Sequence, residues 1–205
     1  VSLYRQKVAE KNRIALKPVV LFKSKTIKES QENHRIFCGL ITHLDSATVK
    51  SALNAPKNET EKTIISKAIQ FFITNNDDAE ALVNDIRSAF APVRLVEVNS
   101  TDDAGNKQIL LNTLESHTNE IRAIFAVDML NEGWDVLNLF DIVRLYGARD
   151  SGKPTVQEAQ LVGRGARYCP FVWGDEEQTY VRKFDKELDH ELRAIEQLHF
   201  HSLEN

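Results

Sequence analysis

The sequence contains little of what marks several large classes of protein. Two cysteines are too few for a disulfide scaffold, so we expect reduced thiols, although one bridge stays open. Eight glycines among 205 residues are about 4%, below the usual share of about 7%, which excludes collagen-like and low-complexity chains. No apolar run approaches 18 residues, and the first residues lack the apolar core of a signal peptide. We therefore expect a cytoplasmic protein that does not enter a membrane.

Glycine and positive charge are unevenly distributed. Five of the eight glycines fall within the 33 residues 133–165, where the backbone is expected to turn sharply or approach a ligand. The net charge is -4, yet residues 1–50 hold ten Lys and Arg against four Asp and Glu, and residues 144–167 hold five against two. Two basic segments in an acidic chain indicate local anion binding, with solvated surface charge as the alternative for residues 1–17.

Apolar segments alternate between strand patterns and helix patterns. Short apolar runs predict strands at 19–22, 93–98, 121–127 and 139–145. Helical spacing predicts helices over about 26–44, 64–72, 77–90, 107–116 and 180–199, and another that begins at Thr155, whereas 68–74 also fits a strand. Three of these helices begin with a predicted capping pair: Thr26/Glu29, Asp77/Glu80 and Thr155/Glu158. Strands separated by helices predict an α/β domain with a parallel sheet covered on both faces. We expect this domain over 1–175, with a helical insertion at about 46–76, and an appended helix within 176–205.

Residues 147–154, GARDSGKP, nearly match the phosphate-binding loop G-x-x-x-x-G-K-[ST]. The segment follows a predicted strand and precedes a predicted helix, as that motif requires. Pro154, however, replaces the hydroxyl that coordinates Mg²⁺, and proline has no backbone N–H for a phosphate. We favour Pro154 as the start of a helix and keep a self-contained phosphate-loop enzyme that uses 147–153 as an alternative.

Two nearby segments have a more specific chemistry. Residues 160–167, QLVGRGAR, place Arg164 and Arg167 three apart on a predicted helix, so both guanidiniums can leave one helical face. Paired, permanently charged groups suit a phosphate chain during transfer, and scattered surface arginines are the plain alternative. Residues 124–136 run from a buried strand into a loop with glycine and acids, and α/β proteins bind ligands at the carboxyl ends of parallel strands.

Together these segments resemble motifs of the superfamily-two helicases and translocases. Q-x-x-G-R-x-x-R at 160–167 resembles motif VI, G-W-D at 133–135 resembles the end of motif V, and KPVVLFKS at 17–24 resembles motif IV. Within the superfamily, residues 127–136 and 160–171 are most similar to the Res subunit of type III restriction enzymes. The resemblance implies a RecA-like fold and a part in an ATP-dependent DNA translocase.

The resemblance further implies that this chain is the second RecA-like lobe of the motor. A first lobe in the same polypeptide would carry the true phosphate loop and the paired acids, and would hold most of the ATP and Mg²⁺. Arg164 and Arg167 are expected to be catalytic, with Arg167 as the arginine finger. The expected ATP-binding residues are Gln160, Gly163, Gly133 and Asp135.

Double-stranded DNA is the polymer that such a motor would follow. Lys23, Ser24, Asn99 and Ser100 are expected to contact its phosphates, which positions DNA without reading its sequence. Many family members have threonine near the end of the motif V strand, where this chain has Val127, so a motif V contact here needs another residue. A modification (methyltransferase) subunit is the expected partner. The chain shows no acid-acid-lysine nuclease cluster, so we expect no cleavage and, from this chain alone, no ATP hydrolysis.

Other features leave alternatives open. His190, His199 and His201 have no supporting Cys or Asp spacing, so we expect no metal site. The apolar stripe over 184–198 is either core of this lobe or a docking face for another domain. A non-catalytic DNA- or protein-binding module that keeps the fold is a further interpretation of the whole chain.

Overall fold

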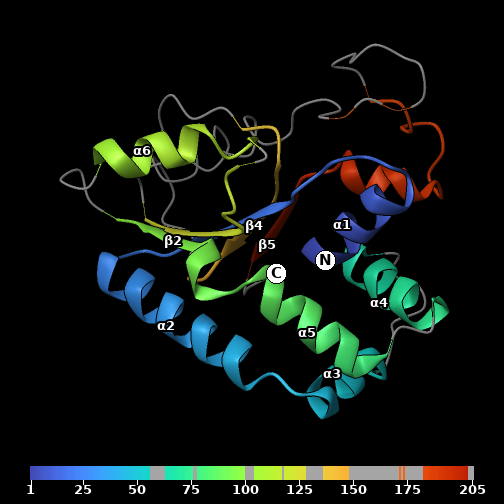
Figure 1. Cartoon of the computed structure of the whole chain (residues 1–205), viewed down its shortest axis with the longest axis horizontal. Helices are drawn as coiled ribbons and strands as arrows, with labels where there is room; N and C mark the ends of the chain where they lie inside the picture. Colours follow the sequence, from blue (N-terminus) through green and yellow to red (C-terminus); the bar gives the residue numbers. More distant parts are fainter. Residues whose placement is uncertain are drawn as a thin grey trace.

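The computed structural model describes residues 1–55, 63–75, 78–99, 104–116, 118–127, 136–147, 171, 173 and 182–202. Figure 1 shows a central sheet with helices on both sides of it. Among these residues, no helix is long and apolar enough to cross a membrane.

A five-stranded sheet forms the centre of the described part, and each neighbouring pair of strands is parallel. The strands are β1 (Val19–Lys23), β2 (Leu95–Val98), β3 (Ala123–Ala126), β4 (Leu139–Arg144) and β5 (His199–Ser202). Their order is β2-β3-β1-β4-β5, so the first strand of the chain lies in the middle. The sheet confirms the predicted α/β class and is consistent with a RecA-like lobe, and the four predicted strands are β1 to β4.

Helices cover both faces of this sheet. They are α1 (Ser2–Lys11), α2 (Ile27–His43), α3 (Ser46–Leu53), α4 (Ile64–Thr74), α5 (Ala79–Ala89) and α6 (Ala104–Asn112), with short 3₁₀ helices η1 (Pro92–Arg94) and η2 (Glu191–Ile195). α6 lies on one side of the sheet, and α2 and α5 lie on the other (Figure 1). Alternate residues of β1 enter different cores, because successive side chains of a strand point to opposite faces. Leu21 packs in the core that contains Leu111 of α6, whereas Phe22 packs with Phe37 of α2.

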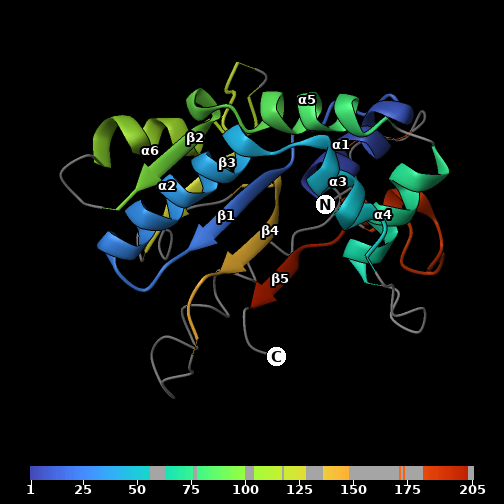
Figure 2. The ribbon, with the colours of Figure 1, turned by 90° about the horizontal axis from the view of Figure 1, so that it is seen from below.

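A third core lies away from α6, where α1, α3 and α4 gather around one end of α5 (Figure 2). It joins buried residues of these helices to η2 and to Phe140 of β4. α3 and α4 occupy the range 46–76 for which a helical insertion is predicted. Residues 68–74 are helical, so the strand alternative for this segment is wrong. The sequence pattern did not predict α1.

Two predicted helices begin with a capping side chain. At the start of α2, Thr26 Oγ1 accepts a hydrogen bond from Glu29 N at 3.2 Å, and Glu29 Oε2 accepts one from Thr26 N at 3.1 Å. This confirms the predicted capping box. α5 begins one residue later than its predicted Asp77/Glu80 pair indicates, because Asp78 is the residue whose carboxylate accepts from Ala81 N.

Replacing Thr26 with alanine should lower the free energy of unfolding by about 1 kcal/mol, since the first turn of α2 then loses its side-chain acceptor. Urea denaturation followed by circular dichroism measures the change. Thr42→Ala is the matched control, because the hydroxyl of this exposed threonine near the other end of α2 donates within its own helix, to Cys38 O at 2.8 Å, and the substitution leaves its backbone carbonyl in place. An equal loss in both variants would contradict the role of the cap.

The predicted helix over 180–199 is wrong. In the described part of that segment, residues 182–202, the chain forms η2 and then β5. The backbone of 199–202 pairs with the open edge of β4, with Asp141 opposite His199. Glu196 stabilises the preceding turn, because its carboxylate accepts from Lys183 N at 2.7 Å and Phe184 N at 3.0 Å. The segment predicted as an appended helix therefore supplies a strand of the sheet.

The apolar stripe of that segment contributes mainly to the core. Phe184, Leu192 and Ile195 are buried in the core with α1 and α4, whereas Leu188 is 58% exposed. A turn followed by a 3₁₀ helix can thus bury apolar side chains whose spacing in the sequence also fits a long helix. The domain boundary at 175/176 stays a prediction.

Candidate functional site

The carboxyl edge of the sheet brings together three of the predicted DNA-contacting residues. Lys23 ends β1, Ser24 follows it, and Asn99 comes directly after β2. Because β2, β3 and β1 are adjacent and parallel, these residues lie along the same edge. Lys23 and Ser24 are only 4% and 1% exposed, so the surrounding chain covers both side chains closely.

Hydrogen bonds fix the position of this edge against α2. Ser24 N donates to Ala126 O of β3 at 3.0 Å, and its hydroxyl accepts from Asn33 Nδ2 of α2 at 2.9 Å. Farther along the edge, His34 of α2 pairs with Glu97 of β2 through its Nδ1. These bonds hold the first turns of α2 over the ends of β1, β3 and β2.

Asn99 and an aromatic cluster complete the surroundings of that pair. Asn99 Nδ2 donates to the other oxygen of Glu97 at 3.5 Å. The ring of His34 lies 4.8 Å from the ring of Phe125, which also stacks on Phe22 at 4.8 Å. The apolar cluster beneath the edge thus supports its polar side chains.

Three buried polar atoms at this edge have no hydrogen-bond partner in the described part of the chain: Ser30 Oγ, His34 Nε2 and Asn99 Oδ1. Ser30 is fully buried, and Ser30 and His34 are four residues apart on one face of α2. A buried polar group without a partner costs free energy, so such a group is uncommon where nothing binds. These atoms can serve a polar ligand on the α2 side of the edge, whereas Lys23, in register with Ala126, lies on the same face of the sheet as Leu21.

All of the predicted ATP-binding and catalytic residues lie outside the described residues: Gly133, Asp135, Gln160, Gly163, Arg164 and Arg167. The same holds for Ser100, predicted to contact DNA, and for nearly all of the segment that resembles a phosphate loop. Arg144, in the same basic segment, ends β4 and has a structural role. Its Nη2 donates to Ser202 Oγ at 2.7 Å, and its guanidinium lies 5.7 Å from the ring centre of Phe200.

A buried charge network lies in the interior beside β4, and the sequence patterns did not predict it. Arg5 of α1 is completely buried and forms an ion pair with Asp141 of β4. Its other donors reach Ala194 O at 2.8 Å and His199 Nδ1 at 2.6 Å. His201 Nε2 donates to the second oxygen of Asp141 at 2.9 Å. The network thus joins the first helix of the chain to β4 and to β5.

A signal for this network is present in the sequence. Asp141 interrupts the apolar run LFDIV in a strand with both faces covered, and an acid in such a place needs a buried cation as its partner. Nothing in the sequence showed which cation that is. The sequence left two interpretations of the basic residues within 1–17, solvated surface charge and anion binding. Arg5 fits neither, because it is buried and paired with Asp141.

The network shifts the pKa values of its members. Burial raises the pKa of Asp141, but the hydrogen bond from His201 and the charge of Arg5 outweigh it, so the pKa is lowered. Burial and then the charge of Arg5 lower the pKa of His199 to about 4. This agrees with the geometry, because His199 Nδ1 must be unprotonated to accept a hydrogen bond from Arg5.

The low pKa of His199 predicts a loss of stability in mild acid. Between about pH 6.5 and pH 4 the unfolded chain binds a proton at His199 that the folded chain excludes, so the free energy of unfolding falls as the pH falls through this window. Urea denaturation at several pH values measures the slope. In His199→Gln, whose amide oxygen can still accept from Arg5, the slope should be smaller. An unchanged slope would contradict this assignment.

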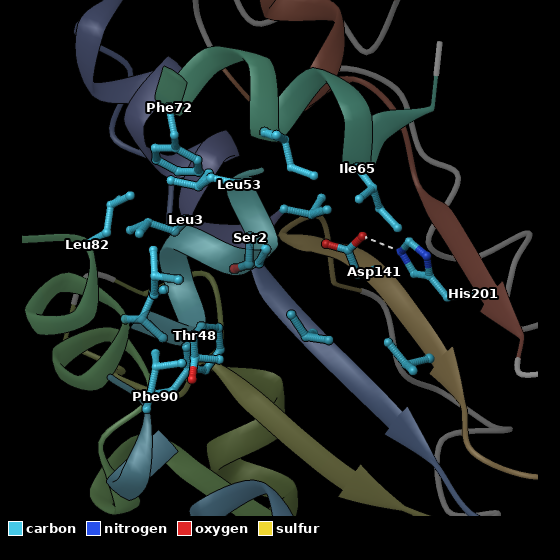
Figure 3. A pocket seen from close by; sticks show the side chains of 18 residues that line it. Ser2, Leu3, Thr48, Leu53, Ile65, Phe72, Leu82, Phe90, Asp141 and His201 are labelled. Atoms are coloured by element: carbon cyan, nitrogen blue, oxygen red, sulfur yellow. Dashed lines mark hydrogen bonds and ion pairs between the residues drawn. The ribbon is translucent and has the colours of Figure 1, made fainter. Parts of the chain in front are cut away.

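An apolar cavity of about 490 Å³ opens beside this network. Figure 3 shows the side chains that line it, with the pair of Asp141 and His201 at one side and residues such as Leu53, Phe72 and Leu82 around the remainder. The charged groups at its wall already bond to one another, so the cavity offers little to a phosphate. Ser2 and Thr48 supply further polar atoms of its lining. We therefore place the candidate site at the carboxyl edge of the sheet.

The three histidines considered for metal binding have other partners. His199 and His201 belong to the charge network. His190 caps η2 by accepting from Leu192 N, and its ring stacks on Phe184 at 4.0 Å. Among the described residues, no group of three or more His, Cys, Asp or Glu is placed to hold a metal ion.

Known proteins match this chain over part of its length. It is 38% identical over 167 residues to a protein of Haemophilus influenzae named as a probable type III restriction-modification enzyme, the HindVIP Res subunit, and the match covers 73% of this chain and 32% of that protein. An uncharacterized protein of the same organism is 46% identical over 54 residues, which are 26% of this chain and 12% of that protein. The family model HI_1054_N, described as an N-terminal region, matches residues 154–205. No solved structure matches.

The match to the Res subunit covers most of this chain but only a minor part of the Res subunit. The chain spans about a third of the length of the Res subunit. The identity nevertheless supports a relationship between this chain and the restriction subunits of type III restriction-modification enzymes.

Proposed function

We propose that the chain is the second motor lobe of an ATP-dependent DNA translocase in a type III restriction-modification enzyme. The observation that carries the proposal is the 38% identity to a Res subunit over 73% of the chain. The parallel sheet and its polar carboxyl edge support it, because this is the edge at which α/β proteins bind ligands.

On the nucleotide side, the lobe completes a site whose other half belongs to a first lobe. Arg167 is the arginine finger and Arg164 its neighbour on the γ-phosphate. The remaining contacts to ATP come from Gln160, Gly163, Gly133 and Asp135. The first lobe holds Mg²⁺ and most of the nucleotide, so the chain by itself hydrolyses no ATP. Robust ATP turnover by the 205-residue chain would overturn the proposal and favour an enzyme that uses the loop at 147–153.

On the DNA side, the carboxyl edge contacts the backbone of double-stranded DNA. Lys23 supplies the positive charge, and Ser24, Asn99 and Ser100 supply neutral hydrogen bonds. The unpaired atoms Ser30 Oγ and Asn99 Oδ1 border the same edge. We further propose that the assembled enzyme works in the cytoplasm with a modification (methyltransferase) subunit.

The role of Lys23 is testable with the chain alone. Lys23→Ala should weaken binding to a fluorescently labelled DNA duplex at every sequence tested, and it should reduce the dependence of log K on log salt by about one, since one phosphate contact is lost. Fluorescence anisotropy over a series of salt concentrations measures both. Lys28→Ala, at an exposed site in the first turn of α2, is the matched control. If folded Lys23→Ala keeps the affinity and slope of the parent chain, the DNA contact is elsewhere.

A further inference from the structure

Three basic residues precede three adjacent strands at the amino edge of the sheet, opposite the candidate site. Lys17 lies two residues before β1, Arg94 directly before β2, and Arg122 directly before β3. The backbone joins two of them, because Arg122 N donates to Arg94 O at 2.8 Å. Since β2, β3 and β1 are neighbours, the sheet itself brings these three cations together.

Arg122 is the most buried of the three and has only neutral hydrogen-bond partners in the described part of the chain. Its guanidinium donates to Gln6 Oε1 and to Ser2 Oγ, the latter at 3.2 Å, and lies 5.7 Å from the ring centre of Phe90. Its Nε has no partner there. A buried cation is ordinarily compensated by an anion, and no carboxylate among the described residues lies within ion-pair distance of this one.

The three cations also raise the local positive potential. Burial, followed by the charge of Arg94, lowers the pKa of Arg122 to about 10. Burial, followed by the charges of Arg122 and, more weakly, Arg94, lowers the pKa of Lys17 to about 8. Glu10 and Glu120 oppose these shifts without reversing them. An anion placed between the cations would relieve the repulsion.

A pocket of about 170 Å³ adjoins Arg122, between α1, α5 and η1. Its polar lining includes Gln6, Lys7, Ser88, Arg94 and Arg122. Two acids also line it, but Lys7 pairs with Asp85 at 2.6 Å and Gln6 donates to Glu10 at 2.8 Å. Pockets for drug-sized molecules are typically about 300–1,000 Å³, so this one suits a small ion.

We propose that this pocket binds a phosphate-class oxyanion, held by the guanidiniums of Arg94 and Arg122. Arg122 supplies a buried charge and an Nε–H that has no partner among the described residues. Arg94, which pairs with Glu120 at 3.5 Å and donates to Ser88 O at 2.9 Å, supplies a second, partly exposed guanidinium at the rim. The ligand is either free inorganic phosphate or a single phosphate of a nucleic-acid backbone. The site is separate from the carboxyl edge and does not depend on the function proposed above.

Thermal denaturation in phosphate and in chloride of equal ionic strength tests the site. Phosphate should raise the Tm of the parent chain above its value in chloride, because a ligand that binds only the folded state stabilises it. Arg94→Met should weaken phosphate affinity by about tenfold or more. Arg122→Met should weaken phosphate affinity to the same degree. If Arg122→Met unfolds because it loses the bonds to Ser2 and Gln6, Arg94→Met alone serves as the test. Arg35→Met, at a site 74% exposed on α2, should change nothing.

Two further measurements sharpen the result. Phosphate binding should raise the pKa of Lys17 and so slow its acylation near pH 8 by an amine-reactive reagent. A DNA duplex that displaces bound phosphate shows that the ligand is a backbone phosphate, whereas retention of phosphate beside bound DNA shows that it is the free ion. Lys23→Ala should leave the phosphate effect intact even where it abolishes DNA binding. Equal Tm in phosphate and chloride, or a full phosphate effect in folded Arg94→Met, would overturn the site.

Discussion

In a protein that joins this chain to the first motor lobe, Arg167→Ala should lower DNA-stimulated ATP turnover by about 10³- to 10⁵-fold. The loss follows from the role proposed for Arg167, since an arginine finger neutralises charge that develops on the transferring phosphate. That charge is greatest in the transition state, so kcat should fall while KM for ATP changes little. Steady-state kinetics with saturating DNA measure both quantities.

Two variants make this result specific. Arg167→Lys keeps one positive charge but loses the planar fork of donors, so it should recover only a small part of the activity. Arg35→Ala removes an exposed arginine whose partner is Glu32 of the same helix, and turnover should stay at the parent level. A loss of less than about tenfold in Arg167→Ala would contradict a finger role at this position.

Asp141→Ala should lower the free energy of unfolding by about 3–5 kcal/mol. The carboxylate compensates Arg5, which is completely buried, and also accepts from His201. Its removal leaves a guanidinium charge inside the protein with only carbonyl and imidazole acceptors. Domains of this kind are stable by about 5–15 kcal/mol, so urea denaturation should show a much earlier transition.

The paired variant separates charge compensation from packing. Arg5→Met combined with Asp141→Leu removes both charges and should cost far less than Asp141→Ala alone, because no buried charge is left uncompensated. Asp85→Ala breaks the partly exposed pair with Lys7 and should cost no more than about 1 kcal/mol. If the double variant is as unstable as Asp141→Ala, lost packing rather than an unpaired charge causes the effect.

Much of the sheet was predictable because its strands are short apolar runs between helices with capping signals. β1 to β4 and the capping box of α2 follow from local patterns of this kind. β5 could not be predicted in this way, because apolar and polar residues alternate only weakly in its four residues HFHS. They form a strand by pairing with the open edge of β4. The apolar spacing before them fits a long helix equally well, and only tertiary packing decides between the two.

The candidate site was partly predictable for a related reason. Residues that end parallel strands meet at one edge, so the strand pattern alone is enough to group Lys23, Ser24 and Asn99. Ser30 and His34 were missed because their role depends on which face of α2 lies toward that edge. Arg5 was missed because a basic side chain is usually solvated, and its partner lies 136 residues away.

β5 also affects how the chain can fold and be shortened. The helix that holds Arg5 precedes every strand of the sheet in the sequence, yet the partners of its guanidinium extend to Ala194 and His199. This helix can dock completely only after residue 199 has been synthesised, a late closure over a long loop that is expected to slow folding. A chain cut at 175, where sequence alone places a boundary, would also leave β4 as a bare edge strand and invite aggregation through it. The last four strand residues therefore protect the sheet from pairing with other molecules.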